Sequence, residues 1–447
     1  MGRMDHDTLS SPAGGLTPLA PRTLDEARLP EPMLIELLLR HLSRAGELKA
    51  GELAWRLGLM LPVVEPTLDF LRAEKLVEVP RRGSFDADVS YALTDLGRLR
   101  ANEALDKCRY VGPAPVALAD YVAQVERQSA KGMRVDRAQI RSALGDAVVP
   151  DALVSRLGAA LNSGRSIYMY GPSGSGKTYL AERMVRTAGG FIHVPHALHV
   201  DGEIVQVFDP LVHIRVEEGA PSSQLDRQAA GDRRWVKARR PVVVTGGELT
   251  IDMLDLELEP HSRFYIAPPQ LKANNGMMIL DDLGRQRIPV RELMNRWIVP
   301  LDRNVDYMAL HTGTKFRVPF DVTVVFSSNL SPAEIGDPAF LRRLGYKIYI
   351  GALDEAGYRE VFRQACLRAN LPHDEAAADF LVRGLHVENR LPLYATIPYD
   401  VISKLRDQAM FMGEEPRLDP ESLRWAWNLY FAPDEGSDGA QSLDDLR

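Results

Sequence analysis

Cysteine is scarce in this chain of 447 residues, which contains only Cys108 and Cys366. The two residues are far apart, and neither belongs to a Cys-x-x-Cys pair. The sequence therefore predicts no disulfide framework. Isolated thiols of this kind are typical of a reducing compartment, so we expect a cytoplasmic protein.

Long apolar runs are absent as well. No window approaches the roughly 18 uninterrupted apolar residues that a membrane span needs, and residues 1–28 lack a signal-peptide pattern. A basic excess is also missing, because the net charge is −7, which argues against a protein coated in nucleic acid. With 45% hydrophobic and 26% charged residues, the chain is predicted to form two or three globular domains without a membrane span.

What the chain does contain is a glycine-rich loop between a predicted strand, 167–170, and a predicted helix, 179–187. Glycines permit backbone angles that let successive N–H groups surround a phosphate, and the helix N-terminus adds its positive dipole end. We expect Lys177 to reach the β- and γ-phosphate oxygens and Thr178 to complete the coordination of Mg²⁺. The predicted phosphate-binding residues are Gly171, Pro172, Ser173, Gly174, Ser175, Gly176, Lys177 and Thr178.

Two later apolar stretches end in polar side chains. Residues 277–280 lead into Asp281 and Asp282, and residues 324–328 lead into Asn329. We expect Asp281 to hold Mg²⁺ through its water shell, and Asp282 to orient and deprotonate an attacking water molecule. Asn329 is expected to polarise that water or to bind the γ-phosphate. Together with the loop, these residues predict a site that hydrolyses a nucleoside triphosphate.

A short predicted helix at 337–344 carries two adjacent arginines, Arg342 and Arg343. Such side chains suit the stabilisation of transition-state charge on the nucleotide of a neighbouring subunit. Paired arginines are also common on surface helices, so this pattern means little alone.

The N-terminal part divides into three segments. Residues 1–30 lack hydrophobic periodicity and are predicted to be a disordered tail. Residues 31–110 predict three helices, two strands and a further helix capped by Thr94, and they resemble a winged helix-turn-helix domain. Residues 111–150 are predicted to form a helical linker.

DNA contact by residues 31–110 is one of two interpretations. Residues 31–100 contain ten basic and eleven acidic residues, whereas a DNA-binding domain is usually distinctly basic. Only Arg81 and Arg82 in the predicted wing look like phosphate contacts. The sequence therefore favours a protein-docking or subunit-packing module, with DNA contact as the alternative.

Residues between the phosphate loop and Met277 predict a β-rich insertion near 200–270. Three histidines precede it, His193, His196 and His199, but Pro195 opposes the helix that would align them, so ordinary strand or loop histidines are favoured over a metal site. Phe264 and Tyr265 are interpreted as residues that pack in a core, and contact with a substrate is the alternative.

The order of these motifs resembles the AAA+ ATPases over about residues 150–430. The resemblance implies an α/β fold, with a parallel sheet flanked by helices in a nucleotide-binding domain at 151–350 and a helical lid at 351–432. The acidic residues 433–447 after the lid are expected to be disordered.

The same resemblance implies roles for the site residues. It assigns Walker A to residues 171–178, Walker B to Asp281 and Asp282, sensor 1 to Asn329, and an arginine finger to Arg342 or Arg343. It also implies ATP and Mg²⁺ as ligands and a site completed between subunits of a homo-oligomeric ring, usually a hexamer.

The sequence departs from the family pattern in two places. Walker B usually ends in Asp-Glu, whereas Asp282 is one methylene shorter. In the sensor 2 region Tyr399 stands where an arginine is common, which leaves open whether Arg390 or Lys404 replaces it. A predicted hairpin at 307–319 is similar to that of the AAA+ branch that includes enhancer-binding activators and the chaperone-like MoxR enzymes.

Three functions fit these residues. The first is an Mg²⁺-dependent ATPase whose ring remodels a protein partner recruited by the winged-helix domain. The second is an ATP-controlled regulator that binds DNA through residues 31–110. The third is a nucleotide switch that binds ATP with negligible turnover.

Overall fold

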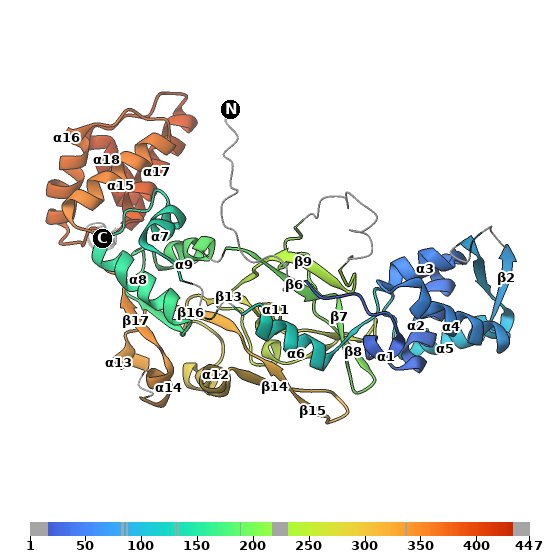
Figure 1. Cartoon of the computed structure of the whole chain (residues 1–447). Helices are drawn as coiled ribbons and strands as arrows, with labels where there is room; N and C mark the ends of the chain where they lie inside the picture. The colour runs from blue at the N-terminus through green and yellow to red at the C-terminus, as the bar shows by residue number, and fades with distance from the viewer. Residues whose placement is uncertain are drawn as a thin grey trace, which may run out of the picture.

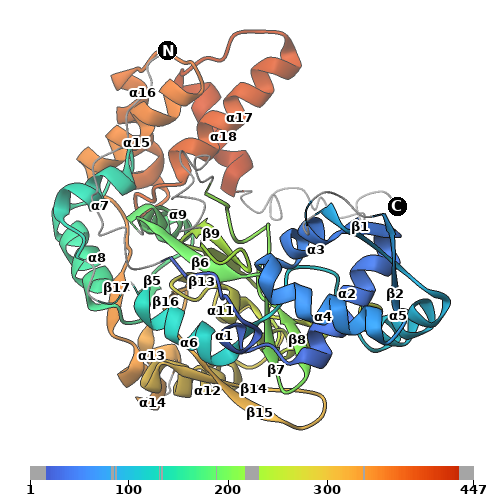
Figure 2. The same cartoon turned by 45° about the vertical axis from the view of Figure 1, so that its right-hand side comes forward.

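A computed structural model describes residues 17–81, 85, 88–129, 131, 134–187, 189–216, 231–335 and 338–431. The described chain forms an N-terminal unit, a central α/β body and a bundle of C-terminal helices (Figure 1). Figures 1 and 2 both place the N-terminal unit and the C-terminal helices on opposite sides of the body.

The centre of the body is a five-stranded parallel sheet in the order β10-β13-β16-β5-β17. Its strands are β5 (Ile167–Tyr170), β10 (Val242–Thr245), β13 (Gly276–Leu280), β16 (Val322–Ser328) and β17 (Tyr346–Tyr349). The central strands read as nearly continuous apolar runs because helices cover both faces. This arrangement confirms the predicted α/β class with helices flanking a parallel sheet.

Alternate residues of the sheet enter different cores. Ile167 and Met169 pack with three helices, α7 (Arg137–Leu144), α8 (Asp151–Ser163) and α9 (Lys177–Met184). Tyr168 packs on the other face with α12 (Val290–Arg303) and α14 (Pro338–Arg343). The two-residue period of a strand therefore separates the two layers.

A second, mixed sheet has the order β11-β12-β8-β7-β4. It contains β4 (Val116–Ala117), β7 (Ala197–Val200), β8 (Glu203–Gln206), β11 (Glu257–Leu258) and β12 (Tyr265–Ile266), and beside it β6 (Phe191–Pro195) pairs with β9 (Trp235–Arg239). Four strands of this sheet lie within or close to 200–270, the range predicted for a β-rich insertion, but the range and the sheet do not coincide. β10 lies within 200–270 and belongs to the parallel sheet, while β4 comes from the predicted linker, because short apolar strands do not reveal which sheet they join.

The N-terminal unit contains α2 (Glu31–Ala45), β1 (Glu47–Lys49), α3 (Ala50–Leu57), α4 (Leu61–Ala73), β2 (Val77–Arg81), β3 (Ser90–Leu93) and α5 (Asp95–Lys107). The strands form an antiparallel sheet in the order β1-β3-β2. Thr94 caps α5, as predicted, by accepting a hydrogen bond of 3.0 Å from Gly97 N. The predicted wing residue Arg82 lies outside the described residues.

The predicted disordered tail is wrong for residues 17–30. Residues 24–27 form the short helix α1 (Leu24–Ala27), which is capped by Thr23. Ala27 and Leu29 are buried in the core of the N-terminal unit. These few apolar contacts were missed because the segment is too short to show periodicity. Residues 1–16 lie outside the described residues.

The N-terminal unit packs tightly on the body. The turn between α3 and α4 lies against the backbone of residues 233–234. The packing is so close that a Cβ at Gly58 would lie 3.0 Å from the Arg233 carbonyl carbon. Beside it, buried Arg234 forms an ion pair of 2.7 Å with buried Asp232 and donates a hydrogen bond of 3.1 Å to Ala27 O. Phe264 packs edge-on against Tyr110 at 5.6 Å, which supports its interpretation as a core residue.

The linker is held by polar contacts at the end of α6 (Leu118–Arg127). The buried Gln128 amide donates to Asn275 Oδ1 at 2.8 Å and to His193 O at 3.0 Å, and its oxygen accepts from His193 N at 2.9 Å. A buried amide with several partners fixes one orientation of the helix. The linker is therefore bound to the body between β6 and β13.

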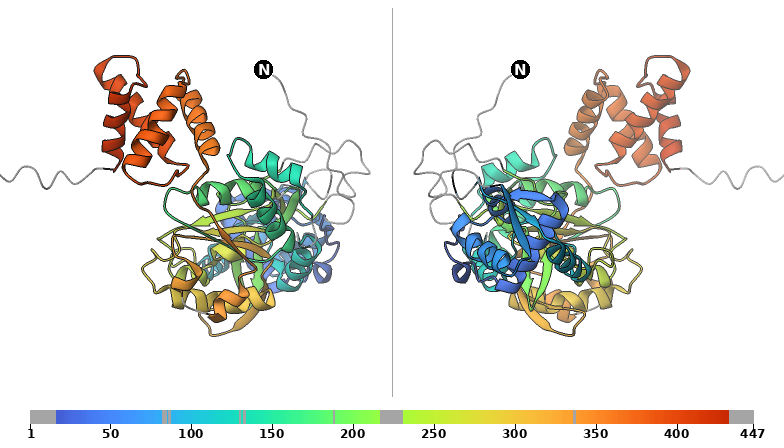
Figure 3. Two further views of the ribbon diagram at one scale, coloured as in Figure 1. Left: turned by 90° about the vertical axis from the view of Figure 1, so that its left-hand side faces the viewer. Right: turned by 90° about the vertical axis from the view of Figure 1, so that its right-hand side faces the viewer.

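The C-terminal helices are α15 (Glu355–Arg368), α16 (Glu375–Asp379) continued by the π-helix η4 (Phe380–His386), α17 (Ile397–Met412) and α18 (Pro420–Phe431). They pack around their own core, and Figure 3 shows the bundle set apart from the body. They lie within 351–432, the range expected for a helical lid. The predicted acidic tail, 433–447, lies outside the described residues.

The remaining elements are short. The predicted hairpin is present as β14 (Val305–Ala309) and β15 (Lys315–Pro319), and α11 (Pro269–Lys272) and α13 (Pro332–Ile335) complete the body. None of the helices in the described ranges combines the length and the apolar character that crossing a membrane would demand.

Arg234→Met tests the contact between the N-terminal unit and the body. We expect a loss of about 3 kcal/mol in the free energy of unfolding, because Asp232 would stay buried without its partner. Urea unfolding measures this loss. Arg233→Met is the matched control, since Arg233 is exposed, and it should change stability by less than about 0.5 kcal/mol. Equal effects of the two substitutions would contradict the role of the buried pair.

Candidate nucleotide-binding site

The phosphate loop connects β5 to α9 and lies close to other backbone. Gly171 and Gly174 have φ values of +152° and +77°, which favour glycine. A Cβ at Gly171 would lie 2.0 Å from Ile350 O, and one at Gly174 would lie 2.6 Å from Thr396 Oγ1. The loop is therefore held between the residue that follows β17 and the N-cap of α17.

Lys177, the first residue of α9, is 7% exposed. Its Nζ donates to Gly171 O at 3.0 Å, Pro172 O at 2.8 Å and Asn329 Oδ1 at 2.8 Å. Burial lowers the pKa of this ammonium, while the charges of Asp281 and Asp282 raise it. The ammonium group thus lies between the phosphate loop and the end of β16, as a residue that binds phosphate oxygens must.

Thr178 meets Asp281 across the sheet edge. Thr178 Oγ1 donates to the two carboxylate oxygens of Asp281 at 2.8 and 3.0 Å. A hydroxyl and a carboxylate are hard oxygen donors, and Mg²⁺ usually takes one or two such side chains together with phosphate and water. These residues therefore fit Mg²⁺. Within the described ranges no three His, Cys, Asp or Glu side chains gather as a metal site, including those at 193, 196 and 199.

Asp282 follows β13 with a left-handed backbone, at a φ of +50°. Aspartate and asparagine adopt this region more readily than longer side chains do, because a short polar side chain can bond locally. The conformation gives a physical reason for aspartate at this position. The nearest cation, Arg285, lies 3.7 Å from Asp282 Oδ2 in an exposed pair, which contributes little.

The two arginines of α14 have different surroundings. Arg343 Nε donates to Asp302 Oδ2 at 2.6 Å, and its Nη1 donates to Ala339 O at 2.6 Å. Arg342 is exposed, and no ion pair of it with another described residue is found. Neither arginine contacts the phosphate loop among the described residues, and α14 lies away from α9 in Figures 1 and 2. The predicted Asp337 at the start of this helix lies outside the described residues.

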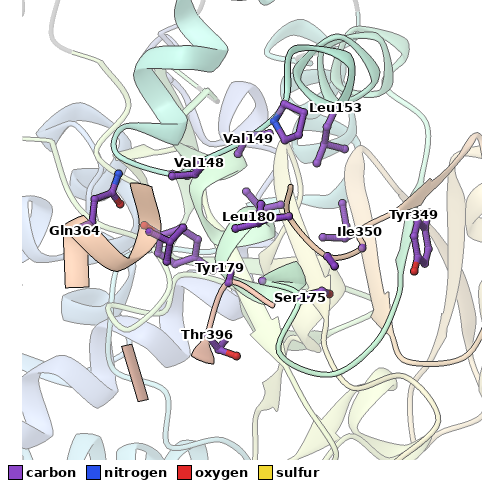
Figure 4. Close-up of a pocket in the computed structure, with 18 of the residues that line it drawn as sticks. Val148, Val149, Leu153, Ser175, Tyr179, Leu180, Tyr349, Ile350, Gln364 and Thr396 are labelled. Atoms are coloured by element: carbon purple, nitrogen blue, oxygen red, sulfur yellow. The ribbon is translucent and has the colours of Figure 1, made fainter. Parts of the chain in front are cut away.

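A cavity of about 420 Å³ opens beside the phosphate loop. Figure 4 shows Val148, Val149 and Leu153 on one side, Tyr179 and Leu180 of α9 below, and Gln364 and Thr396 from the C-terminal helices. The walls are mostly apolar, with few polar groups, as is typical of a pocket for a small-molecule ligand. Sequence reasoning missed this cavity because its walls come from five separate segments.

The C-terminal helices touch the loop directly. Thr396 donates to Gly174 O from its backbone N at 3.3 Å and from its Oγ1 at 3.2 Å. Tyr399 lies in the cavity wall, and its hydroxyl donates to Gln364 Oε1 at 3.3 Å. The bundle is therefore positioned to respond to a ligand at the loop.

Neither sensor 2 candidate reaches the cavity. Arg390 is exposed, and Lys404 lies over the ring of Tyr430 with its Nζ 5.5 Å from the centroid. The basic side chain that the bundle contributes to the cavity wall is Arg368 of α15, which also pairs with Asp146. Its guanidinium carbon lies 4.9 Å from the ring centroid of Tyr399. Sequence reasoning missed Arg368 because its spacing matches no motif.

Residues 354–429 match a family described as a domain of unknown function (DUF8689). No curated protein matches the chain.

Solved structures with a similar fold include NtrX from Brucella abortus in complex with ADP, with 15% identity over 79% of this chain and a TM-score of 0.37. This chain spans 62% of that NtrX chain. The RuvB Holliday junction branch migration motor of Thermotoga maritima has 14% identity over 70% of this chain and 76% of its own, with a TM-score of 0.34. At these TM-scores the likeness is distant.

Asp282→Asn and Asp282→Glu test the carboxylate at the end of β13. The asparagine variant keeps the backbone conformation and loses the base, so we expect ATP hydrolysis to fall by about 100-fold or more while ATP binding remains. The glutamate variant should also be slower than wild type, because the left-handed backbone disfavours it and its carboxylate is displaced. Phosphate release and equilibrium ATP binding are the measurements. A glutamate variant as fast as wild type would contradict the explanation for aspartate.

Proposed function

We propose that this protein is an Mg²⁺-dependent ATPase of the AAA+ type, which acts as a homo-oligomeric ring and remodels a protein partner. One observation carries the proposal. At a single edge of the parallel sheet, Lys177 lies within hydrogen-bond distance of Asn329, and Thr178 lies within hydrogen-bond distance of Asp281. This is the combination of cation, hydroxyl, amide and carboxylate that phosphoryl transfer to water requires.

Each side chain has a distinct task in this proposal. Lys177 and the N–H groups of the phosphate loop bind the β- and γ-phosphates, and Thr178 and Asp281 hold Mg²⁺. When bound, Mg²⁺ neutralises charge that develops on the phosphate oxygens. Asp282 accepts the proton of the attacking water, and Asn329 orients that water. The apolar cavity beside the loop receives the adenine ring, and the contact between the loop and the C-terminal helices passes the state of the loop to the lid.

The surroundings of the two arginines favour Arg342 as the residue that acts on a neighbouring subunit. Arg343 is held by Asp302 within its own chain, whereas Arg342, which has no such ion pair among the described residues, can extend from the surface. An arginine supplied in this way stabilises the transition state. Because Arg342 does not contact the phosphate loop of its own chain, it supports a site completed between two copies.

Both cysteines are free thiols, which fits the cytoplasm.

The N-terminal unit has the element order of a winged helix, and its surface favours a protein partner. In DNA-binding relatives of this motif the second helix of the turn enters the major groove. Here α4 exposes Phe70, and Asp69 pairs with Arg72 at 3.1 Å. The turn before α4 packs on the body through Gly58. An apolar, charge-balanced face of this kind suits a protein better than phosphate.

A complementation experiment tests the shared site. Lys177→Ala should bind ATP weakly, and Arg342→Ala should bind ATP but hydrolyse it about 10³-fold more slowly. A mixture of equal amounts of the two variants should regain activity. The Arg342→Ala subunit keeps an intact phosphate loop, and the Lys177→Ala subunit supplies the arginine. Arg343→Ala is the matched control and should keep most of the activity. Particle size with ATP is measured in parallel. Wild-type protein that binds ATP without turnover would support the nucleotide switch instead, and a monomer with full activity would exclude a shared site.

DNA binding is tested with the full-length chain and a fluorescent duplex. At about 50 mM salt, we expect the chain to bind the duplex no more tightly than a reference protein of the same net charge does, because the N-terminal unit has no basic excess. Tight binding that weakens steeply with added salt would favour the DNA-binding regulator over the remodelling enzyme.

A further inference from the structure

Gln286 is a buried residue four positions after Asp282 to which no motif assigns a role, and it is 9% exposed. Its Nε2 donates to Asp281 O at 3.2 Å and to Gly246 O at 3.3 Å. Its Oε1 accepts from Gly284 N at 2.8 Å. Both N–H groups and the oxygen of the amide are therefore used, and they connect the turn that carries the two aspartates to Gly246.

These contacts begin where the sheet ends. The last backbone hydrogen bond that continues the pairing of β10 with β13 runs from Asp281 N to Thr245 O at 2.8 Å. Beyond this bond, the next carbonyl groups along the two strands are those of Gly246 and Asp281. The side-chain amide of Gln286 donates a hydrogen bond to each of them. The side chain thus continues the strand pairing by one step, into the segment that holds the proposed base.

The backbone of this segment needs such a restraint. Asp282 has a φ of +50° and Gly284 has a φ of +107°, and left-handed conformations at residues other than glycine persist only when their surroundings enforce them. Leu283 is fixed from the other side, since its N donates to Ser327 O at 2.9 Å and its O accepts from Ser328 Oγ at 2.6 Å. Gln286 holds the peptide plane between residues 281 and 282, which sets the direction in which Asp282 leaves the strand.

We propose that Gln286 is a positioning residue for ATP hydrolysis, which orients Asp282 through the carbonyl of Asp281 and couples this turn to the Gly246–Gly247 loop. This inference rests on the proposed function. It predicts that loss of the amide displaces the Asp282 carboxylate while the phosphate loop, and with it ATP binding, is left in place.

Gln286→Met removes the three hydrogen bonds and keeps a side chain of similar length. Gln270→Met is the matched control, because Gln270 is also buried, at 2% exposed, and its Nε2 donates to Leu254 O at 2.6 Å and to Asp306 Oδ2 at 3.2 Å, apart from the two aspartates of the turn. Both variants should lose similar thermal stability. Only Gln286→Met should lose kcat, on the order of 10²-fold, with KM for ATP changed by less than about threefold.

A second background separates positioning from general damage. If Gln286 acts through Asp282, Gln286→Met should lower the remaining rate of Asp282→Asn by less than about threefold, because residues that act as a unit are not additive. Two results would overturn the role of Gln286. One is a further loss of kcat in Asp282→Asn as large as the loss that Gln286→Met causes in wild type, and the other is the same kcat in Gln286→Met and Gln270→Met. Absence of turnover in wild type would instead contradict the proposed function on which this role rests.

Discussion

The site depends on parallel strand pairing. Because β13, β16 and β5 are parallel and in register, their carboxyl ends meet at one edge, and three segments that are far apart in the sequence present their polar ends together. The hydrogen bonds from Thr178 to Asp281 and from Lys177 to Asn329 then connect the first turn of α9 to the ends of β13 and β16. A slip of one residue in this register would turn these ends to opposite faces.

Around this edge the molecule is built as connected layers. Thr396 joins the C-terminal helices to the phosphate loop, and Gln128 joins the linker to β6 and β13. On the far side of the body, the pair of Asp232 and Arg234 and the close packing at Gly58 hold the N-terminal unit. In the proposed enzyme, a change at the loop is therefore transmitted to a lid that contacts it, while the partner-binding unit keeps a fixed orientation on the body.

Much of the site could be predicted because its chemistry is local. The glycines at 171, 174 and 176 and the residues Lys177 and Thr178 occupy one loop, and Asp281 and Asn329 each follow an apolar strand, so motif and spacing identified them. What the sequence could not reveal depends on distant segments. The cavity wall combines Val148, Tyr179, Ile350 and Tyr399, and the difference between Arg342 and Arg343 arises from Asp302, which lies 41 residues before Arg343. The burial of residues within 17–30 was missed because the segment is too short to show periodicity, and the membership of β10 in the parallel sheet was missed because a short apolar strand does not reveal which strands it pairs with.

The central claim is that this sheet edge hydrolyses ATP with Mg²⁺ held between Thr178 and Asp281. The most direct measurement is the rate of phosphate release from ATP as Mg²⁺ is titrated, for wild type and for Asp281→Ala. The account predicts no release in the presence of EDTA, saturation with Mg²⁺ in wild type, and a large loss of rate in Asp281→Ala that excess Mg²⁺ does not restore. Equal rates with and without Mg²⁺, or an Asp281→Ala variant as active as wild type, would contradict it.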